Sequence, residues 1–95
     1  NTVYLAGQVG NIGDDVATQC RTALSAVDAQ LAAAGTDKSK ILQTTVLLAD
    51  IGDFDAMNAV WDDWVPPGDA PPRATVQAKL ARPEWKIEIV VTAAI

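Results

Sequence analysis

Four apolar, β-branched segments alternate with two segments of helical periodicity, and this order constrains the fold more than any other feature. The extended segments are rich in Val, Leu, Ile or Thr and span residues 2–8, 41–49, 74–80 and 86–94. Such runs, bounded by Gly or Pro, are typical of strands. We therefore expect the order β-α-β-α-β-β in a single α+β domain, residues 1–95. In such a domain, two helices pack on one face of a mixed sheet.

The first helical segment is the best-defined element of the sequence. Apolar side chains recur every three or four residues from Val16 to Leu31, which predicts one buried stripe that includes Cys20. An aspartate at position 14 or 15 can accept hydrogen bonds from the free N–H groups of the first turn. Gly35 can end the helix in the left-handed conformation. We expect Cys20 to be a core residue.

The second helical segment begins at Asp53 and ends before the proline pair at 66–67. Its acidic residues, Asp62 and Asp63, fall on the side that we expect to face solvent. We interpret its two tryptophans as core or subunit packing. The apolar side is formed by Phe54, Met57, Val60, Trp61 and Trp64.

The apolar content is high for so short a chain. Of the 95 residues, 49% are hydrophobic, and the mean hydropathy is +0.13. A domain of this size buries only about 60–65% of the surface of its unfolded chain, so a core shared between subunits would stabilise it. The sheet also keeps one face and at least one edge without a cover. We expect the chain to associate with copies of itself in a closed ring.

Charge and cysteine content exclude several classes of function. The seven Lys and Arg are scattered among twelve Asp and Glu, for a net charge of −5, whereas binding to nucleic-acid phosphates needs clustered cations. Cys20 is the only cysteine, which excludes an internal disulfide and favours a reducing compartment. No apolar run reaches the ~20 residues that a membrane-spanning helix needs. We expect a cytoplasmic protein with neither nucleic acid nor membrane as a partner.

Two charged residues stand out as candidates for chemistry, because the chain has no histidine and no cluster of metal ligands. Arg73 follows a double proline and opens an apolar strand, and Glu88 is the only acid within the last apolar run. A guanidinium is a rigid fork that suits a small carboxylate. A carboxylate in apolar surroundings can accept a proton or orient a water molecule.

A simple model of the last two strands keeps these two residues apart. In a tight antiparallel hairpin centred on Pro83, Glu88 faces Ala78. Arg73 then lies five residues further along, about 16 Å away at ~3.3 Å per residue, and on the opposite face. Either a bulge or a wider connection changes this register, or the site combines groups from two subunits. We favour a site at a subunit interface.

Several sequence motifs, in order along nearly the whole chain, resemble the RidA (YjgF) family of reactive-intermediate imine deaminases. Any one of them is weak evidence, but the ordered set is specific. The motifs are L-A-G-Q-V-G at 5–10, A-A-A-G at 32–35, T-T-V-L-L-A-D at 44–50, D-F-D-A-M-N at 53–58, P-P-R-A-T-V at 71–76 and K-I-E-I-V-V-T-A at 86–93.

The resemblance implies a chorismate-mutase-like fold and a homotrimer with ligand clefts between neighbouring subunits. It implies hydrolysis of reactive enamines and imines, such as 2-aminoacrylate, to 2-oxo acids and ammonia, with no cofactor and no metal. Arg73 would hold the substrate carboxylate, and Glu88 would position or activate the attacking water. Asn58 would line the cleft, and the backbone at Gly7 would contact the ligand.

The chain departs from the family pattern in three places. Ala6 stands where many members have Ser or Thr, which removes a hydroxyl contact. Thr75 stands where many have Cys or Ser, and its hydroxyl can still hydrogen-bond to a substrate. The family's N-terminal strand, with its aromatic cleft residue, is not in this sequence, so we expect an N-terminal piece to be missing. These differences bear on substrate preference more than on fold.

Two other functions stay open at this point. One is a non-catalytic binder or sensor of small carboxylates such as 2-oxo acids, which uses Arg73 without catalysis by Glu88. The other is the ribonuclease or translation-inhibitor activity associated with the family, against which the acidic charge and the lack of histidine count. Structural roles are the alternatives for the site residues: an ion pair for Arg73, a solvated position for Glu88 and a capping contact for Asn58.

Overall fold

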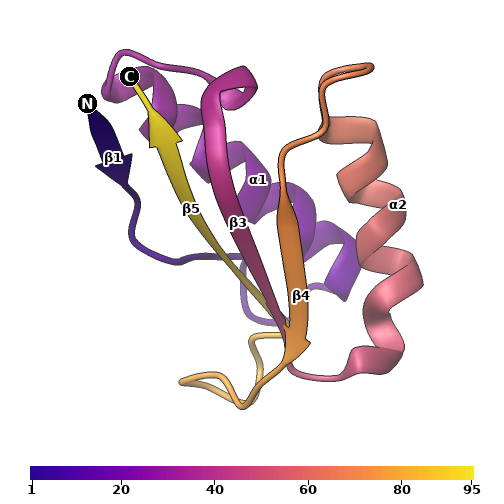
Figure 1. Ribbon diagram of the computed structural model, residues 1–95. Helices are drawn as coiled ribbons and strands as arrows, with labels where there is room; N and C mark the ends of the chain where they lie inside the picture. Colours follow the sequence, from indigo (N-terminus) through magenta and orange to yellow (C-terminus); the bar gives the residue numbers. More distant parts are fainter.

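Five strands form one mixed sheet, and two helices pack against it (Figure 1). The computed structural model describes residues 1–95. The strands are β1 (Thr2–Tyr4), β2 (Gln8–Val9), β3 (Ile41–Leu48), β4 (Arg73–Gln77) and β5 (Ile87–Ala94). Their order in the sheet is β1-β5-β3-β4, and β2 also pairs with β5. β3 and β4 run parallel, whereas every other pair is antiparallel.

Helix α1 (Val16–Ala33) begins and ends where the sequence predicts. The carboxylate of Asp15 accepts a hydrogen bond from the N–H of Thr18 at 2.8 Å, as an N-cap residue does. Gly35 follows the helix with a φ of 83°, which only glycine adopts freely. The N–H group after this glycine bonds back to the carbonyl of Leu31 and closes the helix end.

Helix α2 (Phe54–Trp64) starts directly after Asp53. Asp53 makes no capping hydrogen bond through its side chain. A short 3-10 helix, Ile51–Asp53, leads into α2, and there Asp50 accepts a hydrogen bond from the N–H of Gly52 at 2.8 Å. A second 3-10 helix of three residues precedes β3. None of the helices is long and apolar enough to cross a membrane.

The core lies between the sheet and the helices. Alternate residues of β5 are buried, because successive side chains of a strand point to opposite faces of the sheet. Cys20 lies within this core, as the periodicity of the sequence predicts. The best-buried members from the helices are Cys20, Ala23, Leu24, Val27, Leu31 and Met57, and those from β5 are Ile87, Ile89, Val91 and Ala93.

The first predicted strand, residues 2–8, is divided in two. Tyr4 of β1 lies opposite Thr92, whereas Gln8 of β2 lies opposite Ile89. From Tyr4 to Gln8 the chain advances four residues, whereas β5 advances only three between their partners. One extra residue is therefore accommodated between the two short strands. Such an extra residue bends a strand and locally interrupts its ladder, as in a β-bulge.

The predicted hairpin of the last two strands is wrong. β3 lies between β4 and β5, and Leu47 of β3 faces Val76 on one side and Glu88 on the other. Glu88 therefore does not face Ala78. The reason is the connection through α2, which returns the chain so that β4 lies parallel beside β3 and leaves the other side of β3 to β5.

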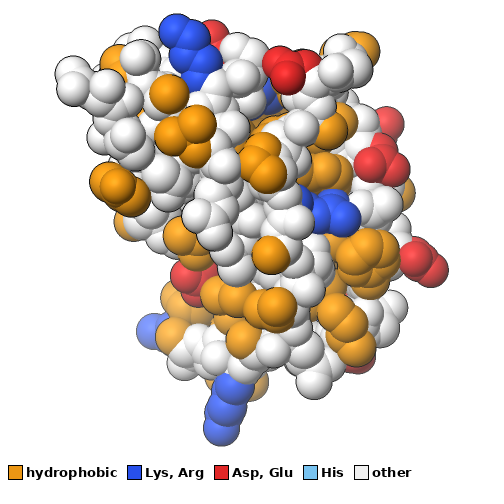
Figure 2. Space-filling view, viewed as in Figure 1, with side chains coloured by type: hydrophobic (Ala, Val, Ile, Leu, Met, Phe, Trp, Pro, Cys, Tyr) orange, Lys and Arg blue, Asp and Glu red, His pale blue; other side chains and the backbone are white.

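The face of the sheet that no helix covers carries apolar side chains, as Figure 2 shows. β3, β4 and β5 each turn alternate residues toward this face, and Glu88 lies among them. Several large apolar residues of the sheet and its ends are strongly exposed, namely Tyr4, Leu42, Val76 and Ile95. An apolar face of this kind in a small domain is typical of a surface that another chain covers.

Candidate functional site

Arg73 lies at the start of β4, an edge strand, and its guanidinium packs against α2. Its Nη1 donates a hydrogen bond to Oδ1 of Asn58 at 2.8 Å. The guanidinium carbon lies 5.5 Å from the ring centre of Phe54 and 5.0 Å from that of Trp61. These helix residues meet Arg73 together because positions three, four and seven apart share one face of a helix. Met57, on the same face, places its sulfur 3.8 Å from Nη1.

The guanidinium of Arg73 has only neutral polar partners. The amide oxygen of Asn58 and the sulfur of Met57 both contact Nη1. An arginine carries five N–H donors, so the edge formed by Nε and Nη2 keeps donors for a further acceptor. A half-buried cation with no carboxylate partner is a natural anchor for an anionic ligand.

Asn58 lies next to this anchor rather than apart from it. Its oxygen accepts from Arg73, and its Nδ2 lies 3.5 Å from a carboxylate oxygen of Asp62, one helical turn further along. The side chain amide therefore stands between a guanidinium and an exposed carboxylate. This arrangement orients the arginine without neutralising it, since the contacting group carries no net charge.

Thr75 lies two residues after Arg73 and on the same face of β4. Its hydroxyl oxygen is buried and has no hydrogen-bond partner within the chain. The same is true of Thr44, which lies on β3 directly beside Arg73. Buried hydroxyls are rarely left without a partner, so Thr75, which is partly exposed, is a candidate for contact with a bound molecule, whereas Thr44 is fully buried. Thr44 was not predicted, because nothing in its local sequence distinguishes it from Thr45.

Glu88 and Gly7 form a second group, on the face of the sheet that the helices leave uncovered. Glu88 is half-buried on β5, level with Val9 and Leu47. A Cβ atom at Gly7 would lie 2.0 Å from Oε2 of Glu88. The bulge between β1 and β2 therefore brings the Gly7 backbone against the carboxylate, and only glycine leaves room for the side chain as it stands.

Arg73 and Glu88 lie on opposite faces of the sheet. Arg73 is level with Thr44 and Val91, and Val91 is buried beneath the helices. Glu88 is three residues from Val91 along β5, an odd number, and therefore points to the other face. One chain thus brings Arg73 together with Asn58, and Glu88 together with Gly7, but it does not bring the two groups around one ligand.

The lone thiol is not equipped for nucleophilic catalysis. Burial raises the pKa of Cys20 to about 11, although the positive charges of Arg21 and Arg73 act in the opposite direction. The thiol is therefore protonated at neutral pH, and a protonated thiol is a poor nucleophile. Among residues 1–95, no three His, Cys, Asp or Glu side chains gather in a way that could hold a metal ion.

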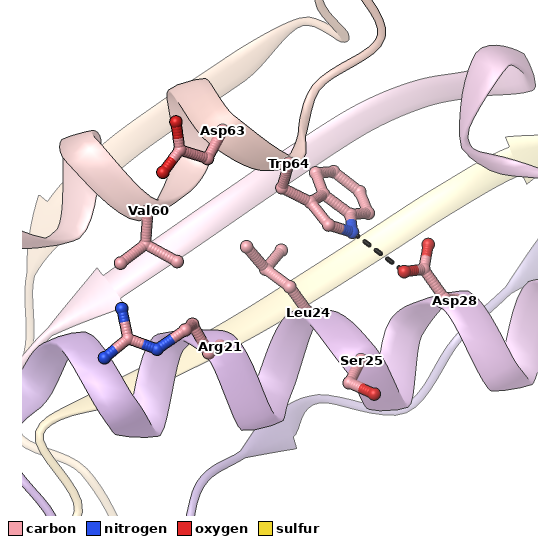
Figure 3. A pocket seen from close by; sticks show the side chains of 7 residues that line it. All are labelled: Arg21, Leu24, Ser25, Asp28, Val60, Asp63 and Trp64. Carbon is pink, nitrogen blue, oxygen red and sulfur yellow. Dashed lines mark hydrogen bonds between the residues drawn. The ribbon is translucent and has the colours of Figure 1, made fainter.

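Two hollows on the surface lie elsewhere. A cavity of about 200 Å³ opens between α1 and α2, with a floor of Leu24 and Val60 (Figure 3). At one end, Nε1 of Trp64 donates a hydrogen bond to Asp28 at 3.0 Å. The larger hollow, about 660 Å³, is lined by residues 77–83 with Ala49 and Trp85. Neither hollow includes Arg73 or Glu88.

Known proteins resemble this chain over its whole length. The family model for endoribonuclease L-PSP matches residues 1–95. A RutC family protein of Haemophilus ducreyi is 52% identical over 97% of this chain and 80% of its own length. The human 2-iminobutanoate/2-iminopropanoate deaminase is 33% identical over 97% of this chain and 72% of its own.

The fold agrees with these matches. The crystal structure of a YjgF family protein from Neisseria meningitidis is 44% identical and superposes with a TM-score of 0.93. The superposition covers 97% of this chain and 77% of the Neisseria protein. The chorismate-mutase-like α+β architecture expected from the sequence is thereby confirmed, with two helices on a mixed sheet. The chain therefore belongs to the endoribonuclease L-PSP family, that is, the RidA (YjgF) family.

Proposed function

We propose that this protein is a hydrolytic deaminase of reactive imines and enamines derived from small amino acids, and that it works as a homotrimer in the cytoplasm. The observation that carries the proposal is the half-buried Arg73 guanidinium, which is held by Asn58 and contacts no carboxylate. The name of the human relative supports the choice of substrate. Substrates of this class carry a carboxylate next to the reacting C=N bond, so an arginine anchor places that bond at a defined distance.

In the proposed reaction, the free edge of Arg73 donates two hydrogen bonds to the substrate carboxylate. The hydroxyl of Thr75 supplies a further polar contact beside it. Water attacks the imine carbon while Glu88 accepts one of the protons of the water. Glu88 returns this proton to the nitrogen, and the resulting carbinolamine then loses ammonia. An enamine substrate first gains a proton at its terminal carbon to form the imine. The products are a 2-oxo acid and ammonia, and no redox change occurs.

The separation of Arg73 and Glu88 within one chain supports a site built from two subunits. Arg73 stands on an edge strand, where a neighbouring subunit can approach it. Glu88 and Gly7 lie on the apolar face that a neighbouring subunit would cover. In a ring of three copies, the edge of one subunit meets the uncovered face of the next, and each contact completes one site.

The first experiment uses purified protein and imines generated in place by an amino-acid oxidase, with semicarbazide as the competing trap. We expect Arg73→Ala to lower kcat/KM by about a hundredfold or more, because a substrate that is no longer held in position reacts far more slowly. Arg73→Lys keeps the charge but not the fork, and is the matched control. Unchanged turnover in Arg73→Ala, in protein that still forms trimers, would refute the assignment.

Mixing two inactive variants tests the interface directly. Arg73→Ala and Glu88→Gln are each expected to be inactive alone, but when they are unfolded and refolded together, some sites combine an intact arginine with an intact glutamate. Random assembly of a ring predicts that about a quarter of the sites recover both groups. No recovery above the separate variants would show that both groups must come from the same chain.

A non-catalytic sensor of 2-oxo acids is the second candidate, because the arginine anchor alone is sufficient to bind a carboxylate. It predicts equal 2-oxo acid affinity for the native protein and Glu88→Gln, with no imine hydrolysis by either. The description of the matching family model also calls for a ribonuclease assay. The net charge of −5 does not favour RNA binding, and only cleavage that persists in Arg73→Ala after extensive purification would support this activity.

A further inference from the structure

Trp61 is the closest aromatic neighbour of the Arg73 guanidinium, although it lies in the core. Its side chain is only 4% exposed, and its ring centre lies 5.0 Å from the guanidinium carbon. Phe54 flanks the same group at 5.5 Å. A guanidinium near the face of an indole or a phenyl ring is attracted by the electrons of that ring, and the attraction grows when water is excluded.

The contacts on Arg73 are unevenly distributed around its guanidinium. Asn58 and Met57 both contact Nη1, and the two aromatic rings lie beside the guanidinium carbon. Nε and Nη2 have no hydrogen-bond partner within the chain. Those two nitrogens form one straight edge that matches the two oxygens of a carboxylate.

We propose that Trp61 is a positioning residue, whose buried indole, aided by Phe54, holds the Arg73 guanidinium with its Nε–Nη2 edge toward the ligand carboxylate. This inference rests on the proposed function of Arg73 as the carboxylate anchor. An arginine side chain loses substantial rotational freedom when it is immobilised. Because the rings and Asn58 immobilise it in advance, less of that loss falls on ligand binding.

A purely structural role is the alternative for Trp61, which belongs to the buried core and packs against Trp64 with ring centres 5.4 Å apart. Trp64 is therefore the matched control, since it contacts the same core and lies over Lys38 instead of Arg73. Replacement of either tryptophan by leucine removes an indole from α2. Only the replacement of Trp61 removes a ring from the arginine.

The test measures the binding of 2-oxobutanoate by calorimetry, which requires no turnover. We expect Trp61→Leu to bind about tenfold more weakly than native protein, the size of a desolvated cation–π contact. Trp61→Phe keeps a ring and is expected to stay within about threefold, while Trp64→Leu stays within about twofold. In the hydrolysis assay, Trp61→Leu should raise KM more than it lowers kcat.

A magnetic-resonance measurement separates positioning from stability. The order parameter of the Nε–H bond of Arg73 should be high in native protein and in Trp64→Leu, and lower in Trp61→Leu as the guanidinium becomes mobile. Phe54→Leu, at a half-buried position, serves as the second variant if Trp61→Leu does not fold. Equal affinity of Trp61→Leu and Trp64→Leu for 2-oxobutanoate would overturn the inference. If Trp61→Leu does not fold, equal affinity of Phe54→Leu and native protein would overturn it. If Arg73→Ala itself leaves 2-oxobutanoate binding intact, the proposed anchor fails instead.

Discussion

Gln19 is a fully buried glutamine whose side chain joins three segments of the chain, and its replacement by methionine should destabilise the fold strongly. Nε2 donates to the carbonyl of Asp14 at 3.0 Å and to that of Glu84 at 3.1 Å. Oε1 accepts from the N–H of Lys86 at 2.8 Å. Two of these contacts cross more than sixty residues of sequence, so they tie the entry of β5 to α1.

Methionine has nearly the same shape as glutamine, so the variant removes the hydrogen bonds with little change in packing. Three partly buried backbone groups then lose their partner, at about 1 kcal/mol each, or about 3 kcal/mol in total. This is a large part of the roughly 5–15 kcal/mol that stabilises a domain. For a chain of this length, it corresponds to a midpoint of thermal unfolding about 12–24 °C lower.

The assay is urea unfolding at one fixed protomer concentration, with the slope of the transition compared between variants. Gln19→Glu is the matched variant, because it keeps the acceptor for the N–H of Lys86 and places a carboxylate against two carbonyl oxygens. Its pKa should be raised by that environment, so its deficit should shrink as the pH falls and the acid becomes a donor. A methionine variant within about 1 kcal/mol of native protein would refute the reasoning, because it would mean that the three groups have other partners.

Two further predictions follow from the glycines and the helix cap. Gly7→Ala places a Cβ atom against the flexible end of the Glu88 side chain, so we expect this variant to lose hydrolysis but to unfold in urea nearly as native protein does. Gly10→Ala places a Cβ atom 2.4 Å from the Cα of Gln19, so we expect this variant to be less stable than native protein. The reverse pattern in paired activity and unfolding measurements would contradict this. The pKa of Asp15 is lowered, chiefly by a hydrogen bond from a backbone N–H in the first turn of α1. A carboxylate with a lowered pKa stabilises the fold at pH values above its ordinary pKa of 3.8. This contribution is lost as the pH falls through the lowered pKa. Asp15→Ala should therefore be less stable than native protein at pH 7, and the difference should close in acid; a difference independent of pH would argue against the cap.

Local patterns predicted the elements well, because the signals for them lie within a few residues. The apolar stripe, the cap at Asp15 and the left-handed Gly35 all act within α1 and its ends. The strand predicted at residues 86–94 is likewise present as β5. Boundaries shifted where tertiary contacts intervened, most clearly in residues 2–8, which the bulge divides.

Pairings between distant segments were not predictable in the same way. The hairpin model for the last strands was wrong because nothing in residues 73–88 records that β3 lies between them. The contacts of Arg73 with two aromatic rings were also not predicted, although the sequence places Phe54 and Trp61 on one face of the helix. Gln19 carried no sequence signal, since its partners lie on backbone groups far along the chain.

By itself, the sequence determined the alternation of strands and helices, the ends of α1 and the family to which the chain belongs, since these depend on residue type and short spacing. Only the tertiary structure decided the strand order, the contact of Gly7 with Glu88 and the placement of Arg73 on the opposite face. The physical reason is that the partner of a strand depends on how much apolar surface and how many backbone hydrogen bonds each possible sheet arrangement buries or forms. The sequence of one strand shows only which of its residues prefer to be buried.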